Sequence, residues 1–147
     1  MLEPSRNGGE NPRSTRNFVG NVALLPGRRI QRPRRKGTAL PEGTIYVGRP
    51  TMWGNPFEHR QWGHAKATIL HKNWLDGKLG ALTLERMGFC PSEIEALERL
   101  RARVLTDLHK LAGHHLACWC SPSSEWCHAA TLLRMAPEYA EIERAAL

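Results

Sequence analysis

Three of the four cysteines lie in one short stretch, CWCSPSSEWCHAA at residues 118–130, and His128 directly follows the last of them. Thiol and imidazole groups are the side chains that bind zinc, and they also serve as nucleophile and base in covalent catalysis. The stretch therefore admits three interpretations: a zinc site, a reactive thiol, or a packed turn without chemistry.

A zinc site would draw on four candidate ligands: Cys118, Cys120, Cys127 and His128. Structural zinc sites usually pair ligands that are separated by two to four residues. Here one residue separates the first pair, and the second pair is adjacent. Zinc is therefore a possible cofactor that the spacing does not favour.

A reactive thiol has better local support. Cys127 and His128 are predicted to open a helix, whose positive end lowers the pKa of a thiol. If the preceding segment is a strand, Cys118 and Cys120 point to the same face, with Cys118 deeper in the core. The candidate catalytic residues are Cys127, His128 and Cys120, while packing alone remains open as the alternative.

A second polar cluster lies in YVGRPTMWGNPF at residues 46–57, directly after a predicted strand. Arg49, Thr51 and Asn55 are the candidate substrate-binding residues, because a guanidinium, a hydroxyl and an amide suit a phosphate or carboxylate. In open α/β sheets, ligands bind beyond the carboxyl ends of the strands. If both strands are parallel, this loop and the cysteine loop meet at one edge; the alternative is a rigid loop that covers the core.

The elements that would position these loops follow from residue patterns. Strands are predicted at Arg29–Gln31, Thr44–Gly48 and His115–Cys120, where β-branched, aromatic or apolar residues gather. Proline and glycine make residues 49–57 a loop. This order, with helices between the strands, predicts a small single-domain α/β sandwich with a short parallel sheet covered by helices.

Three helices are predicted from apolar spacing and end signals. The first covers His64–Leu75. The second begins at a capping box formed by Ser92 and Glu95 and ends by Gly113, and the third covers Cys127–Met135 before Pro137 stops it. Residues 77–91, between the first two helices, are interpreted as a variable connection that holds Cys90.

The net charge of +7 comes from the N-terminal third of the chain. Residues 1–50 hold ten basic and three acidic residues, so the whole excess lies there. Such an arm fits weak, non-specific nucleic-acid binding or a solvated tail. The expected organisation is a flexible basic segment over residues 1–27, a globular domain over 28–137 and a helical tail over 138–147.

The composition also bears on the cellular location of the protein. No apolar run is long enough for a membrane span, and the start has no secretory signal pattern. We therefore expect a cytoplasmic protein without a membrane partner, whose cysteines are reduced thiols or metal ligands.

The two motifs together resemble the family called domain of unknown function 4326, small proteins of bacteriophages and bacteria, over about residues 28–136. Its first motif, Gly-Arg-Pro-x-x-Trp-Gly-Asn-Pro-Phe, is met at residues 48–57, and its second, Cys-Trp-Cys-x-Pro then Cys-His, at residues 118–128. Here Ala129 and Ala130 follow the histidine, where acidic or glycine residues are common. The resemblance strengthens the site and implies no particular reaction.

Three functions stay open on these residues. The first is an enzyme that acts on a nucleotide-like or other anionic small molecule at the Arg/Asn/Cys/His site. The others are a non-catalytic nucleic-acid-binding module that uses the basic arm, and a small structural zinc domain.

Overall fold

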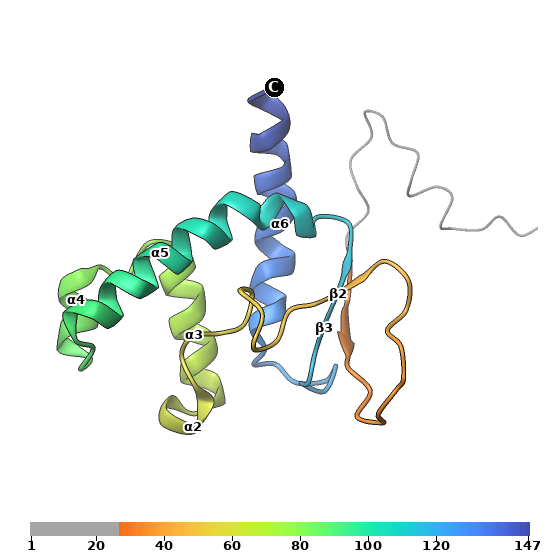
Figure 1. The fold of residues 1–147 in the computed structure, drawn as a ribbon, viewed down its shortest axis with the longest axis horizontal. Helices are drawn as coiled ribbons and strands as arrows, with labels where there is room; N and C mark the ends of the chain where they lie inside the picture. Colours follow the sequence, from red (N-terminus) through yellow and green to blue (C-terminus); the bar gives the residue numbers. More distant parts are fainter. Residues whose placement is uncertain (1–26) are drawn as a thin grey trace, which may run out of the picture.

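A computed structural model describes residues 27–147 of the chain (Figure 1). Its sheet consists of β1 (Arg29–Gln31), β2 (Thr44–Tyr46) and β3 (His115–Cys118), in the order β1-β3-β2. Both pairs are parallel. The small α/β domain with a parallel sheet is thereby confirmed, whereas most of the predicted basic segment, residues 1–26, lies outside the described residues.

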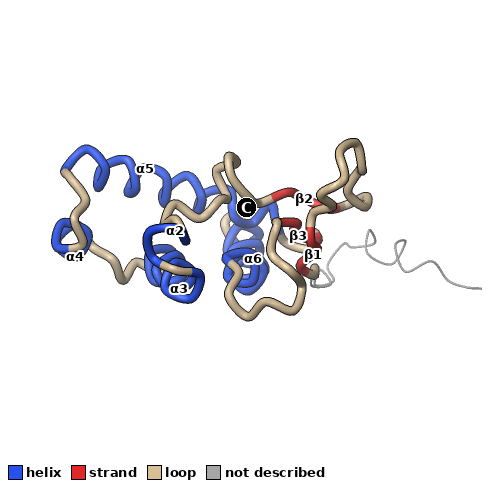
Figure 2. The backbone as a smooth tube through the Cα atoms, turned by 90° about the horizontal axis from the view of Figure 1, so that it is seen from below, coloured by secondary structure: helices blue, strands red, loops and turns tan. Residues whose placement is uncertain are grey.

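The helices extend to one side of the sheet. In both views α6 stands between the strands and α3, and α4 lies farthest from the sheet (Figures 1 and 2). Within residues 27–147, no helix is long and apolar enough to cross a membrane. The helical segments are α2 (His59–Trp62), α3 (His64–Leu75), α4 (Ala81–Arg86), α5 (Pro91–Asp107), the short 3-10 helix η1 (Leu108–Leu111) and α6 (His128–Ala145).

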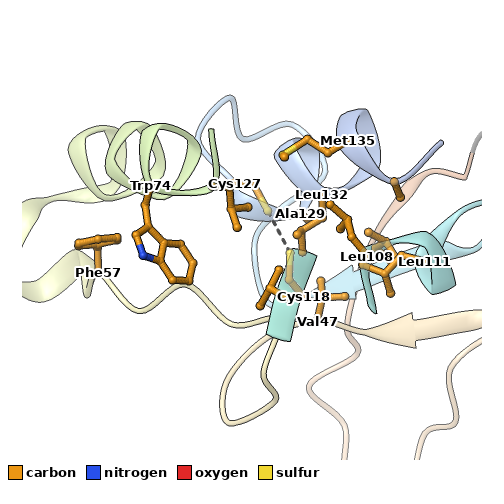
Figure 3. Packing of buried hydrophobic residues seen from close by; sticks show 14 of the residues in the cluster. Val47, Phe57, Trp74, Leu108, Leu111, Cys118, Cys127, Ala129, Leu132 and Met135 are labelled. Atoms are coloured by element: carbon orange, nitrogen blue, oxygen red, sulfur yellow. Dashed lines mark hydrogen bonds between the residues drawn. The ribbon is translucent and has the colours of Figure 1, made fainter. Parts of the chain in front are cut away.

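The core lies between the central strand and α6. Leu116 and Ala117 of β3 are completely buried, as expected for the middle strand of a parallel sheet. Leu132 of α6 is also completely buried, and Figure 3 shows it among the core side chains close to Cys118. α6 therefore packs against the apolar residues of β3, and Cys127 lies directly before the first residue of this helix.

The loops that follow β2 and β3 lie at the same edge of the sheet. Backbone pairing continues past the strand ends, since Val47 N–H donates to Ala117 O at 2.8 Å and Arg32 N–H donates to Cys118 O at 2.7 Å. Because all three strands run in the same direction, the loop after β2 and the loop after β3 leave the sheet at the same edge, as the sequence predicted.

The prediction that Pro137 stops the third helix is wrong. Pro137 lies inside α6, which begins one residue later than predicted and continues to Ala145. A proline inside a helix removes one backbone hydrogen bond. Here Met135 and Ala136 directly before it are buried, so packing of the helix against the core offsets that loss. The predicted tail over residues 138–147 is largely the continuation of this helix.

The middle of the chain contains one helix that was not predicted, and the predicted start of the next helix needs correction. Residues 77–91 contain α4, which the sequence pattern did not reveal. The capping residue of α5 is Cys90 rather than Ser92, and Cys90 N–H donates to the Glu93 carboxylate at 2.9 Å. The helix therefore starts at Pro91, because proline is favoured at the first position of a helix, where its missing N–H costs nothing.

Replacing Pro137 by alanine should stabilise the protein. The exposed proline in the interior of α6 costs up to about 3 kcal/mol relative to alanine, because alanine restores the missing helix hydrogen bond. Chemical denaturation should show a higher unfolding midpoint for Pro137→Ala. Pro91→Ala is the matched control and should bring no gain, since Pro91 occupies the first position of α5. Equal effects of the two substitutions would contradict this account.

Candidate functional site

A cleft of about 410 Å³ lies where the two loops meet. Five of the six residues predicted to bind or act on substrate line it; Thr51 does not. The five are Arg49, Asn55, Cys120, Cys127 and His128. Within residues 27–147, no carboxylate lines this cleft. The complete lining is Arg34, Tyr46, Gly48, Arg49, Asn55, Phe57, His59, His64, Ala67, Thr68, Cys118, Trp119, Cys120, Trp126, Cys127 and His128.

Asn55 fastens the first loop to α3. Its side-chain amide donates to Ala67 O at 3.0 Å, and its side-chain oxygen accepts from Phe57 N–H at 2.9 Å. Thr51 has a comparable local contact, since its hydroxyl donates to Gly48 O at 2.6 Å. The polar atoms that sequence reasoning offered to a ligand thus hold the loop in shape.

Arg49 lies at the exposed side of the same loop. Its Nε donates to Asn55 O at 3.0 Å, and its Nη1 lies 3.7 Å from the Glu58 carboxylate. Gly54 permits this packing, because a Cβ at that position would approach Arg49 Cγ to 2.9 Å. The guanidinium is thereby directed along the cleft wall while remaining about half exposed.

Three thiols gather at the base of the cleft. The sulfurs of Cys118, Cys120 and Cys127 all lie within 4.8 Å of one another. The shortest separation is 3.2 Å, between the sulfurs of Cys118 and Cys127, drawn as a dashed line in Figure 3. Cys118 and Cys127 are buried, whereas Cys120 is partly exposed and Cys90, the residue before α5, is exposed. Strand alternation puts Cys118 and Cys120 on one side, and the loop between β3 and α6 returns Cys127 to them.

Arg29 of β1 holds that returning loop. Its Nη2 donates to Pro122 O at 2.7 Å and to Ser124 O at 2.8 Å. Its Nη1 is buried and has no hydrogen-bond partner. This residue was assigned no role from sequence, because its partners lie more than ninety positions away and are main-chain carbonyls that carry no side-chain signal.

The cluster favours one thiolate, at Cys127. Hydrogen bonds from Cys118 and then Cys120 hold the pKa of the Cys127 thiol below its ordinary value, and His128 and Arg29 act in the same direction. The pKa of Cys118 is raised, first by its hydrogen bonds with Cys120 and Cys127. Sequence reasoning expected the lowered pKa of Cys127 from the helix start, but its thiol neighbours contribute most.

His128 has a defined orientation. Its Nε2 lies 2.8 Å from Val47 O, and a carbonyl can only accept, so Nε2 carries the proton. In the neutral ring Nδ1 is then the acceptor. His128 therefore links the first loop to α6 through its protonated nitrogen, and its side chain also contributes to the lowered pKa of Cys127.

His71 of α3 is a neighbour that sequence reasoning missed. It is 1 % exposed, its ring centroid lies 5.4 Å from that of His128, and its Nδ1 is buried without a partner. Burial, followed by the charge of His128, lowers the pKa of His71 to about 3. Its place beside Leu70 and Trp74 on the apolar face of a predicted helix was the available signal.

These features define a class of protein: a small α/β domain that carries a thiol–histidine cluster at the carboxyl edge of a parallel sheet. The family model described as Domain of unknown function (DUF4326) matches residues 30–138, and the chain belongs to this family. No curated protein and no solved structure matches the chain.

Acid should destabilise the fold through His71. Its pKa is 6.5 in the unfolded chain and about 3 in the fold, so between these values the unfolded state binds the additional proton. The free energy of unfolding should therefore fall as the pH falls from 6.5 toward 3, by at most about 1.4 kcal/mol per pH unit from this group. Denaturation at several pH values measures the slope.

His71→Leu supplies the comparison for that slope. It removes the titrating ring and leaves an apolar side chain in an apolar site, so its unfolding free energy should depend less on pH over the same range. A packing change would shift the stability at every pH, whereas loss of the titration changes the slope. Identical slopes for the two proteins would contradict the buried neutral histidine.

Proposed function

We propose that this protein is a cytoplasmic enzyme of bacteria or bacteriophages that acts on a nucleotide-like anionic small molecule bound in the cleft. The observation that carries the proposal is the composition of the cleft wall. Cationic and aromatic side chains surround a base of three thiols and a histidine, and no carboxylate takes part.

The charged groups favour an anion. Arg34 and Arg49 line the cleft, and His59 and His64 stack at its side with ring centroids 4.4 Å apart. Arginine binds phosphate with paired N–H groups, and charge-assisted hydrogen bonds are stronger than neutral ones. Among the described residues that line the cleft there is no carboxylate. Arg49 is paired with Glu58 outside the cleft at 3.7 Å, so Arg34 is the arginine of the lining that forms no ion pair within residues 27–147.

The aromatic groups favour a planar ring next to that anion. Trp119 is 45 % exposed and Trp126 is 41 % exposed, and both line the cleft together with Tyr46. Stacking of a base on such side chains contributes about 1–3 kcal/mol. A molecule with both a phosphate and a base could contact the cationic and the aromatic side chains of the cleft wall together, whereas a simple carboxylate could contact only the cationic ones.

The reacting groups are proposed at the base of the cleft. Cys120 and Cys127 supply sulfur, and His128 supplies the basic Nδ1 that its contact with Val47 leaves unprotonated. Asn55 and Thr51 contribute by holding the loop that carries Arg49. A reduced thiol cluster is compatible with the cytoplasm, where thiols are kept reduced.

Non-specific single-stranded nucleic acid is a second candidate ligand, favoured by one observation. The Arg32 guanidinium lies 4.3 Å from the ring centroid of Tyr46 and 5.1 Å from that of Trp119. No aromatic residue lies among the basic residues in the sequence around Arg32, but the fold brings the rings of Tyr46 and Trp119 to Arg32. Combined cationic and aromatic surfaces are typical of single-strand binders.

Binding of adenosine monophosphate, adenosine and inorganic phosphate tests the proposal. Quenching of tryptophan fluorescence should show that adenosine monophosphate binds more tightly than either fragment, because only it engages both halves of the wall. Chromatography and phosphorus NMR after incubation with a nucleotide panel would then detect conversion. Equal affinities for adenosine and its monophosphate would contradict the anion site.

Arg34 and Arg35 provide a matched pair for the same measurement. Arg34→Gln should weaken adenosine monophosphate binding about 10-fold, because a hydrogen bond to a charged group contributes about 1.5–3 kcal/mol. Arg35→Gln removes the same charge from the neighbouring residue, which does not line the cleft, and should leave the affinity within about 2-fold. Equal losses in both variants, with oligonucleotides bound more tightly than the mononucleotide, would favour the second candidate.

A further inference from the structure

The three clustered sulfurs have the geometry of metal ligands. A tetrahedral zinc ion with Zn–S bonds of about 2.3 Å keeps its sulfurs about 3.8 Å apart. The Cys118 and Cys127 sulfurs are 3.2 Å apart, and no pair in the cluster exceeds 4.8 Å. Each pair is therefore within about 1 Å of the required separation. The spacing argument against zinc concerned ligand pairs that are close together in sequence. The fold brings Cys127, directly before α6, to Cys118 at the end of β3 and Cys120 in the loop that follows.

The charge around the cluster is suited to bound thiolates. Three thiolates around a divalent ion carry a net charge of −1. Arg29 holds the loop that joins Cys120 to Cys127, and its buried Nη1 has no hydrogen-bond partner. An unpaired buried donor on a cation is costly, and a negatively charged cluster beside it offsets that cost. Three neutral thiols packed as small apolar groups would leave the charge of Arg29 with only the two carbonyl contacts of its Nη2.

The set of ligands stops at three. Among residues 27–147, no further histidine, cysteine or carboxylate joins the group of Cys118, Cys120 and Cys127. His128, the fourth ligand considered from sequence, directs Nε2 to Val47 O. All three cysteines line the cleft, and Cys120 is partly exposed to it. Structural zinc sites have four protein ligands, whereas catalytic sites have three and one open position.

We propose that Cys118, Cys120 and Cys127 bind one zinc ion as thiolates, and that its fourth coordination position opens into the cleft. The assignment of a catalytic role to this ion rests on the proposed function, because the ligand in the cleft would occupy the open position. Zinc binding itself does not depend on that function. The ion would serve as a Lewis acid toward the bound molecule.

Metal analysis of the full-length protein, purified under reducing conditions without chelator, tests the site. We expect elemental mass spectrometry to show one zinc ion per chain. When cobalt replaces zinc, we expect a thiolate-to-metal charge-transfer band in the absorption spectrum. Cys120→Ser should reduce zinc affinity more than about 100-fold. Mutating a residue that only orients a metal ligand typically costs about 10–100-fold in metal affinity, and removing the ligand itself should cost more. Cys90→Ser, which removes the exposed cysteine outside the cluster, should retain one zinc.

Three results would overturn the proposal. The first is wild-type protein that takes up no zinc from a micromolar solution, and the second is full zinc retention by Cys120→Ser. The third is a Cys118–Cys127 disulfide in protein purified with reductant. Cys120 is chosen because it is partly exposed, so the variant should keep its fold, which circular dichroism verifies. The cobalt spectrum of wild-type protein tests the site without any variant.

The failure of the site and the failure of the proposed function give different results. One zinc per chain without binding of adenosine monophosphate would retain the metal site and remove the proposed ligand. Binding of adenosine monophosphate by metal-free protein, with no zinc taken up on addition, would retain the cleft and remove the metal site.

Discussion

The parallel pairing of β2 and β3 is the constraint on which the rest of the site depends. Because both strands run in one direction, the loop after Tyr46 and the loop after Cys118 leave at the same edge. A change of direction in either strand would send the two loops to opposite ends of the sheet. The contact between His128 and Val47 O joins the two loops directly and fixes the start of α6 against the sheet.

Local rules predicted the parts of the site that depend on local geometry. Strand alternation put Cys118 and Cys120 on one face, and proline and glycine identified the loop after β2. The rules failed where a partner is distant in sequence. The loop that leads to Cys127 is held by Arg29, whose main-chain carbonyl partners lie more than ninety positions away in sequence. Burial of His71 likewise depends on how α3 packs, which a single helix pattern does not specify.

The roles of the polar loop residues show a similar limit. The sequence indicated that Asn55 lies near a ligand, and it does line the cleft, but its amide bonds Ala67 O and its oxygen bonds Phe57 N–H. Residue type alone does not distinguish a group that binds a ligand from one that shapes the loop. Only the partners of the side chain make that distinction.

The contact between Arg29 and the returning loop also bears on how this family can diversify. The guanidinium binds the carbonyl oxygens of residues 122 and 124, and every amino acid has such an oxygen. A side-chain substitution in residues 123–126 would therefore leave these two acceptors of Arg29 in place, although the Ser124 hydroxyl also accepts from Trp126 N–H at 3.2 Å. Trp126 belongs to that segment and lines the cleft. A substitution at Trp126 would thus change the wall of the cleft while the main-chain contacts of Arg29 with the loop remain.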